Sequence, residues 1–220
     1  MNVTITGADD RVDPNALLAL AREFPFVEWG ILYSIKRQST PRYPTESWIN
    51  HLTRIPGLKL SLHLCGEPAR NTLAGGDAWL VERPWFRRVQ VNGYTAPAPA
   101  LVKVAKTLPS FEFILQVRRE EDLQEAARDA AQMPSASLLY DPSGGTGKEC
   151  FRWPVAPFGT KLGYAGGIKP ATVLDVLGQI GPVDESAWID MESGVRDSEN
   201  RFDLGLVREV LEKVANVRNR

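Results

Sequence analysis

An aspartate followed by a glycine-rich segment is the part of this sequence most suited to chemistry. Residues 138–153 read LLYDPSGGTGKECFRW, in which Asp141 closes a short apolar run. A carboxylate that a strand carries onto a flexible loop can donate or accept protons, whereas an ordinary turn capped by an aspartate is the structural alternative. The stretch GGTGK (144–148) does not match a nucleotide-binding P-loop, because Pro142 stands at the first glycine position and Glu149 follows the lysine.

Two later segments also end apolar runs in small residues. They read YAGGIKP (164–170) and IDMESGV (189–195). Backbone N–H groups that are exposed where a strand passes into a helix can bind an anion such as phosphate, although glycines are also common in plain strand-to-helix turns. The candidates for a phosphate site are Gly166, Gly167, Ser193 and Gly194.

The composition is that of an ordinary globular protein. Of 220 residues, 43% are hydrophobic and 24% charged, and the formal net charge is -1. Such a balance favours neither a nucleic acid nor an anionic membrane as partner. Only Cys65 and Cys150 are present, which fits a reducing compartment, and the N-terminus resembles neither a signal peptide nor a membrane span. We therefore expect a cytoplasmic protein.

Short strand-like runs alternate with longer helical patterns along the chain. Such alternation is typical of a parallel sheet with crossover helices, and eight strands in this length predict an α/β fold, a single-domain (β/α)8 TIM barrel over residues 1–220. A poorly patterned link separates the third and fourth strands. The predicted strands are 3–6, 27–34, 58–65, 87–92, 111–117, 137–141, 161–166 and 187–192, and the predicted helices are 13–24, 45–55, 99–108, 120–132, 170–180 and 204–217.

Alternate residues of a barrel strand point into the barrel. In 58–65 this rule places Leu60, Leu62 and Leu64 toward the helices and Ser61, His63 and Cys65 inward. The last inward residues of the strands then form a polar ring at the end where barrel enzymes carry their active sites. Its members are Thr6, Cys65 beside His63, Asn92, Gln116, Asp141, and Asp190 or Glu192. A ligand pocket explains this ring better than a sealed hydrogen-bonded plug, because buried polar groups without partners are costly.

The segments DPSGGTGKECFRW, YAGGIKPATV and DMESGVRD, in this order and spacing, resemble phosphoribosylanthranilate isomerase of tryptophan biosynthesis. Residues 31–47, 89–94 and 3–7 are also similar to that family, and Thr40-Pro41-Arg42 stands where it has Ser-Pro-Arg. The resemblance implies that Asp141 is a general acid in an Amadori rearrangement of a phosphoribosylamine. It also implies that Arg42 contacts the ligand and that the four candidate residues bind its phosphate.

Two positions depart from the family pattern. Thr6 replaces the family's catalytic cysteine base, and Asn92-Gly93 replaces its His-Gly. A threonine hydroxyl is a poor base near neutral pH, so the base could instead be Cys65, His63, or Asp9 or Asp10. His63 and Cys65 could equally be plain pocket lining, and a metal site of His63, Cys65 and Asp141 has no ligand-spacing signature.

Two classes of function follow from these residues. The first is an isomerase-like enzyme that acts on a phosphoribosyl or related sugar phosphate without a cofactor or metal. The second is a divergent barrel that binds a phosphosugar or nucleotide metabolite, or acts on another phosphorylated metabolite. In either case we expect a small phosphorylated molecule as partner, no nucleic acid or membrane, and a monomer or homodimer. The predicted catalytic residues are Asp141, Cys65, His63 and Thr6, and the predicted substrate contacts are Arg42, Asn92, Gln116 and Asp190.

Overall fold

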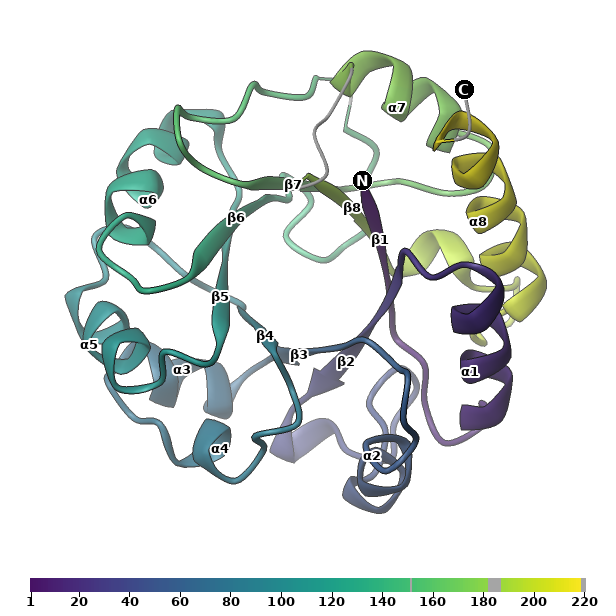
Figure 1. The fold of residues 1–220 in the computed structure, drawn as a ribbon, viewed down its shortest axis with the longest axis horizontal. Coiled ribbons are helices and arrows are strands. Elements are labelled where there is room, and N and C mark those ends of the chain that lie inside the picture. Colours follow the sequence, from purple (N-terminus) through teal and green to yellow (C-terminus); the bar gives the residue numbers. More distant parts are fainter. Residues whose placement is uncertain (151, 182–186, 219–220) are drawn as a thin grey trace.

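Eight parallel strands close into a barrel in sequence order, which confirms the predicted (β/α)8 fold class. The computed structural model describes residues 1–150, 152–181 and 187–218, and Figure 1 views the barrel end-on with the start of β1 toward the viewer. The strands are β1 Asn2–Thr6, β2 Val27–Tyr33, β3 Leu60–Leu64, β4 Arg88–Val91, β5 Glu112–Val117, β6 Ala136–Tyr140, β7 Leu162–Ala165 and β8 Trp188–Met191. Each lies within a few residues of its prediction.

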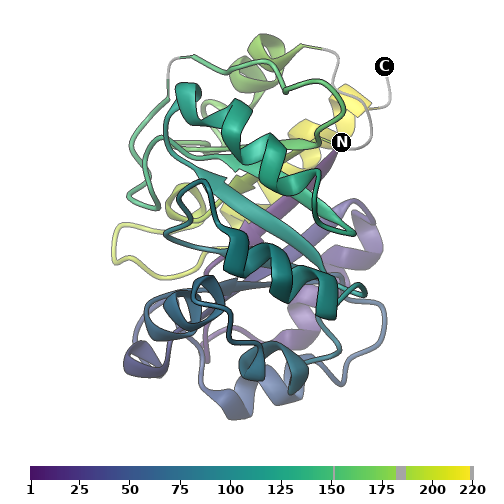
Figure 2. The same ribbon diagram turned by 90° about the vertical axis from the view of Figure 1, so that its left-hand side faces the viewer.

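Helices surround the barrel as an outer ring (Figures 1 and 2). They are α1 Pro14–Glu23, α2 Glu46–Leu52, α3 Glu67–Leu73, α4 Ala78–Val81, α5 Pro99–Thr107, α6 Leu123–Ala130, α7 Val173–Ile180 and α8 Leu204–Arg218, with short 3-10 turns η1 Ile35–Arg37, η2 Glu120–Asp122 and η3 Ser193–Val195. The link after β3 contains α3 and α4, which the sequence reading missed because helices this short show little periodicity. The seventh helix begins at Val173, later than the predicted start at Pro170.

The connection from β6 to β7 differs from the others. Its described residues between 141 and 161 contain no helix, so the glycine-rich segment after Asp141 runs as an extended loop. Its glycines adopt the left-handed backbone region, with φ of 59° at Gly144, 85° at Gly145 and 71° at Gly147. Residues with a Cβ avoid this region, which explains why glycine occupies these positions.

The barrel wall separates two apolar layers. Leu62 and Leu64 are fully buried in the layer between strands and helices, as the alternation in β3 predicts. Inside the barrel, Ile114, Leu139, Ala165 and Trp188 form a separate small cluster. This inner cluster is the floor on which the polar residues at the strand ends rest.

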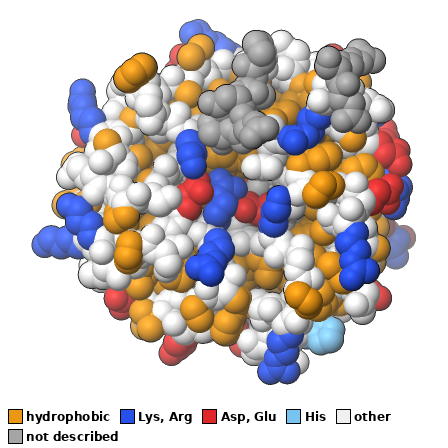
Figure 3. Space-filling model, viewed as in Figure 1, with side chains coloured by type: hydrophobic (Ala, Val, Ile, Leu, Met, Phe, Trp, Pro, Cys, Tyr) orange, Lys and Arg blue, Asp and Glu red, His pale blue; other side chains and the backbone are white. Residues whose placement is uncertain are grey.

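The face at which the strands begin is shown in space-filling form in Figure 3, where Lys and Arg side chains gather around the centre with acidic side chains between them. Among the described residues, no helix combines the length and the apolar character that crossing a membrane requires.

Candidate active site

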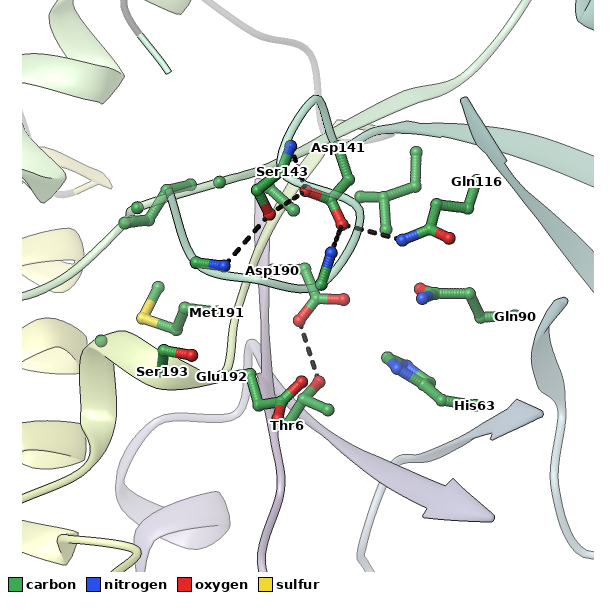
Figure 4. A pocket seen from close by; sticks show the side chains of 18 of the residues that line it. Thr6, His63, Gln90, Gln116, Asp141, Ser143, Asp190, Met191, Glu192 and Ser193 are labelled. Carbon is green, nitrogen blue, oxygen red and sulfur yellow. Dashed lines mark hydrogen bonds between the residues drawn. The ribbon is translucent and has the colours of Figure 1, made fainter. Parts of the chain in front are cut away.

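A polar cavity of about 70 Å³ lies at the carboxyl ends of the strands (Figure 4). It brings together most of the residues that the sequence singles out. The predicted residues that line it are Thr6, His63, Asn92, Gln116, Asp141, Gly166, Gly167, Asp190, Glu192, Ser193 and Gly194. Cys65 and Arg42 are not part of its lining. Figure 4 shows His63 of β3 and Gln90 of β4 pointing toward Asp190, and Gln116 of β5 joined to Asp141.

The Asp141 carboxylate accepts four hydrogen bonds. Its Oδ1 accepts from the backbone N–H of Ser143 at 3.1 Å and from the Ser143 hydroxyl at 2.6 Å. Its Oδ2 accepts from Gln116 Nε2 and from the backbone N–H of Gly145, both at 2.8 Å. Only 4% of the residue is exposed. Because donors engage both oxygens, the arrangement suits an ionised carboxylate, which is acceptor-only.

Asp190 lies on β8 next to Thr6 on β1. The Thr6 hydroxyl donates to Asp190 Oδ1 at 2.9 Å. Burial raises the pKa of Asp190 to about 8, and the hydrogen bond from Thr6 offsets this only in part. The negative charges of Asp141, Glu192 and Glu28 also contribute to this raised pKa. At neutral pH Asp190 therefore carries its proton, and two buried carboxyl groups of opposite protonation state line one cavity.

His63 is held inside the barrel as a neutral imidazole. Its Nε2 lies 2.8 Å from the hydroxyl of Ser61, and only 1% of the residue is exposed. Burial, with the positive charge of Arg88 as a smaller cause, lowers the pKa of His63 to about 3. The ring cannot be charged at neutral pH and so cannot stabilise a neighbouring thiolate.

Cys65 belongs to a hydrogen-bonded chain beside the cavity. Gln90 Nε2 donates to Asn92 Oδ1 at 2.8 Å, and Asn92 Nδ2 donates to Cys65 Sγ at 3.0 Å. Burial raises the pKa of the Cys65 thiol. The chain leaves the buried Oε1 of Gln90 without a hydrogen-bond partner among the described residues, and Gln90 lines the cavity. This acceptor is available to a ligand.

Asp9 and Asp10 lie outside the cavity. Burial raises the pKa of Asp9, but hydrogen bonds from Arg11 and from the backbone of Arg42 outweigh it, and the pKa falls to about 2. Asp10 accepts from the backbone N–H and the hydroxyl of Thr45 at the start of α2. Both carboxylates thus serve the structure of the rim.

Arg42 is engaged with neighbours on the rim. Its Nη1 lies 2.5 Å from Glu192 Oε1 and 3.3 Å from Ser193 Oγ. Its Nη2 donates to Asn200 Oδ1 at 2.8 Å. A ligand carboxylate would have to displace Glu192 to bind this guanidinium, and Arg42 instead supports the turn that carries Ser193.

The candidate phosphate residues form one edge of the cavity. The backbone N–H groups of Gly167 and Gly194 donate no hydrogen bond to any described residue. A Cβ added to Gly194 would lie 1.9 Å from the carbonyl oxygen of Ile168, so the two turns approach closely only because this residue is glycine. Unpaired N–H groups on neighbouring turns can bind an oxyanion.

The loop after β6 closes over this edge. A Cβ added to Gly147 would lie 2.8 Å from Ser193 Cβ, and one added to Gly167 would lie 2.4 Å from Glu149 Cα. Glu149 Oε1 also accepts from Lys169 Nζ at 2.7 Å. The loop thereby limits the cavity to a size that fits an oxyanion or a few water molecules.

Sequence reasoning did not select several residues that line the cavity. Ser143, Gly145 and Gly147 belong to the loop that it did identify, so their nearness to Asp141 was the available signal. Gln90 precedes Asn92 by two residues and so shares its inward face of β4, but no role was assigned to it. Among the described residues there is no group of three or more His, Cys, Asp or Glu side chains that could hold a metal ion.

Comparisons with known proteins give structural likeness alone. No protein-family model matches the sequence. No curated protein matches it either. Phosphoribosyl anthranilate isomerase from Thermus thermophilus superimposes with a TM-score of 0.66 at 20% identity, covering 99% of this chain and 100% of the other. TrpF from Jonesia denitrificans gives 0.66 at 20% identity, covering 99% and 98%. 3-Hexulose-6-phosphate synthase from Salmonella typhimurium gives 0.57 at 14% identity, covering 98% and 99%. These likenesses show that the chain has the fold of these barrel enzymes.

Proposed function

We propose that this protein is an enzyme that isomerises a phosphorylated sugar, in the manner of phosphoribosylanthranilate isomerase. The observation that carries the proposal is the pair Asp141 and Asp190, which line one cavity together with the unpaired N–H groups of Gly167 and Gly194. The names of two structural neighbours, an isomerase of a phosphoribosyl compound and a hexulose-6-phosphate synthase, support the substrate class.

The substrate phosphate would bind at the edge formed by Gly166, Gly167, Ser193 and Gly194. Backbone N–H groups suit a phosphate because they are hydrogen-bond donors that are fixed in position and carry no charge of their own that would have to be desolvated. Ser193 Oγ adds a hydroxyl at the same edge. The sugar then extends toward Asp190, with the unpaired Oε1 of Gln90 as an acceptor for one of its hydroxyl groups.

The isomerisation requires that one group takes a proton from C2 of the sugar and another delivers a proton to the ring oxygen. Two carboxyl groups that hold one proton between them can do both, provided that their environments separate their protonation states. Asp190 has the proton at neutral pH because burial raises its pKa to about 8. Asp141 accepts four hydrogen bonds as a carboxylate.

We accordingly assign Asp190 as the proton donor and Asp141 as the proton acceptor. The resemblance to the isomerase family implied the acid role for Asp141, and the protonation states favour the opposite direction. Thr6 acts through Asp190: its hydroxyl occupies Oδ1 and leaves Oδ2 to carry the proton toward the cavity. Thr6 is thus a positioning residue rather than a base.

The other bases considered from the sequence fit this role less well. His63 faces the cavity, but a pKa of about 3 makes it a weak proton acceptor. Cys65 does not line the cavity, and burial favours its neutral thiol. Asp9 is paired with Arg11 at 2.7 Å and has a pKa of about 2.

Substrate entry requires the loop after β6 to move. The cavity of about 70 Å³ is well below the 300 Å³ or more that a bound metabolite usually occupies. Opening breaks the packing of Gly147 on Ser193, the packing of Glu149 on Gly167, and the exposed ion pair between Glu149 and Lys169. Exposed ion pairs contribute little stability, so the Glu149–Lys169 pair adds little to the cost of opening.

A second candidate function is supported by the same small cavity. A barrel that binds only a phosphate-bearing metabolite, without turnover, also needs the glycine edge. The pairing of Arg42 with Glu192 favours this candidate, because it removes the predicted contact between Arg42 and the substrate.

Direct assay of phosphoribosylanthranilate turnover tests the proposal. We expect turnover by the wild type and its loss in both Asp141→Asn and Asp190→Asn, each checked for folding by circular dichroism. Wild-type activity contradicts the binding-only candidate. Activity that appears only in Thr6→Cys favours a protein that has lost the isomerase reaction, and normal turnover by a folded Asp141→Asn variant refutes the assigned chemistry.

A further inference from the structure

A second and larger pocket lies at the opposite end of the barrel, where the strands begin. It has a volume of about 450 Å³ and is lined by residues at the starts of β1 to β5 and β8 and just before β7. The inner cluster of Ile114, Leu139, Ala165 and Trp188 lies between this pocket and the candidate active site. We name this second pocket the N-terminal mouth pocket, and its volume falls in the range of metabolite sites.

Strand alternation brings cations to this pocket. Lys59 precedes the inward residues Ser61 and His63 of β3 by even steps, and Lys161 stands in the same relation to Ala165 of β7. Both lysines therefore continue inward rows beyond the strand starts. The cations that line the pocket are Lys59, Arg87, Arg88 and Lys161. Figure 3 shows Lys and Arg side chains around the centre of this face.

The two acidic residues of the pocket are committed to Arg88. Arg88 Nη1 lies 2.8 Å from Glu28 and Nη2 lies 3.5 Å from Glu112, and its guanidinium stacks on the ring of Trp188 at 4.3 Å. Thr4 also donates to Glu28 and Ser137 to Glu112. These contacts hold Arg88 and both carboxylates in the wall of the pocket.

The three remaining cations lack an acidic partner in the part of the chain that the structure describes. Among the described residues, neither Lys59 nor Arg87 nor Lys161 forms a salt bridge, and Lys59 Nζ donates only to the neutral carbonyl of Pro25 at 2.6 Å. Among the described residues that line the pocket, four cations against two carboxylates leave an excess of two positive charges, in a chain whose formal net charge is -1. Uncompensated charge concentrated in a concave site attracts anions.

We propose that the N-terminal mouth pocket binds a small molecule with at least two negative charges, of the polyphosphate type. Lys59, Arg87 and Lys161 contact the charged groups, and the Trp85 ring, 41% exposed at the pocket wall, offers a stacking surface for an attached base. The site is separate from the proposed isomerase site, and neither needs the other.

Isothermal titration calorimetry with inorganic tripolyphosphate and with ATP, at low ionic strength, tests this site. The protein used in these titrations carries Ser193→Asp, a substitution that blocks the glycine edge at the other end of the barrel. Adding Lys59→Gln and Lys161→Gln should weaken binding of both probes about tenfold, because two charge contacts are lost. Raising the salt concentration should also weaken binding.

A matched control removes the same charge elsewhere. Lys103 and Lys106 are exposed on α5 and do not line the pocket, so Lys103→Gln with Lys106→Gln should leave the affinity unchanged. If Trp85→Ala weakens the binding of ATP and not that of tripolyphosphate, the ligand is of the nucleotide type. If ATP and tripolyphosphate bind with equal affinity, the ligand is a free polyphosphate. Unchanged binding in the Lys59→Gln, Lys161→Gln protein, or equal weakening in the control, overturns the proposal.

Discussion

Replacing Asp190 with asparagine should make the protein more stable and less active at the same time. The folded protein holds the Asp190 proton up to a pKa of about 8, whereas an aspartate in the unfolded chain has the ordinary value of 3.8. At a pH between these two pKa values, release of the proton stabilises the unfolded state, whereas the folded state keeps its proton and is not stabilised. The wild type therefore loses stability as the pH rises from about 4 to about 8, and this loss is absent at lower pH.

The size of the effect follows from the pKa difference. Each pH unit in that window lowers the free energy of unfolding by about 1.4 kcal/mol, so the loss of stability at pH 7 is about 4 kcal/mol. The asparagine side chain of the Asp190→Asn variant does not titrate, and its amide oxygen can still accept from Thr6. The stabilisation of the variant over the wild type should then be about 3 kcal/mol greater at pH 7 than at pH 5.

Urea unfolding of both proteins at pH 5, 7 and 8 measures this difference. Asp175→Asn is the control, because it makes the same substitution at an exposed position of α7, outside the barrel. The kcat/KM of the wild type should also fall above about pH 8, where the pair Asp141 and Asp190 loses its only proton. A stability gain that is equal at all three pH values, or an Asp190→Asn variant that is less stable than wild type at pH 7, refutes the reasoning.

Three other outcomes are expected. Asp141→Asn should lower kcat at least about 100-fold, because it removes the proton acceptor, and should also lower the unfolding temperature, because an NH2 group replaces one of two oxygens that each accept two hydrogen bonds. Gly147→Ala should weaken phosphate binding, measured by calorimetry, because its Cβ would lie 2.8 Å from Ser193 Cβ; Gly159→Ala, with a similar φ of 73° and nothing within 4 Å of the added Cβ, should not. Gly194→Ala should lower the urea midpoint and abolish phosphate binding, because its Cβ meets the Ile168 carbonyl oxygen at 1.9 Å; an unchanged midpoint contradicts the close approach.

Local pattern was a good guide wherever a strand separates two environments. In β3, alternation predicted Leu62 and Leu64 against the helices and His63 inside, and the structure has this arrangement. Every second residue of a barrel strand contacts the helix layer, so the alternation of apolar and polar residues indicates directly which side chains point inward. The short helices α3 and α4 were missed, because one or two turns leave too few apolar repeats to recognise.

The candidate site shows where such reasoning ends. Asp141 and the glycines of its loop were identified from residue type and spacing. Nothing in the sequence indicated that Arg42 pairs with Glu192, or that Cys65 bonds to Asn92 beside the cavity instead of lining it. Partners so far apart in the chain meet only when the barrel closes.

The sequence by itself determined the barrel, the inward rows of its strands and the position of Asp141 at the end of one of them, because these depend on periodicity and on local backbone preferences. Only the tertiary structure decided which carboxyl group holds a proton. Asp190 is removed from water and lies next to Thr6 of β1 and near the negative charge of Asp141 after β6, in addition to that of its chain neighbour Glu192. Desolvation and charge repulsion depend on distances in space, and those distances exist only in the folded chain.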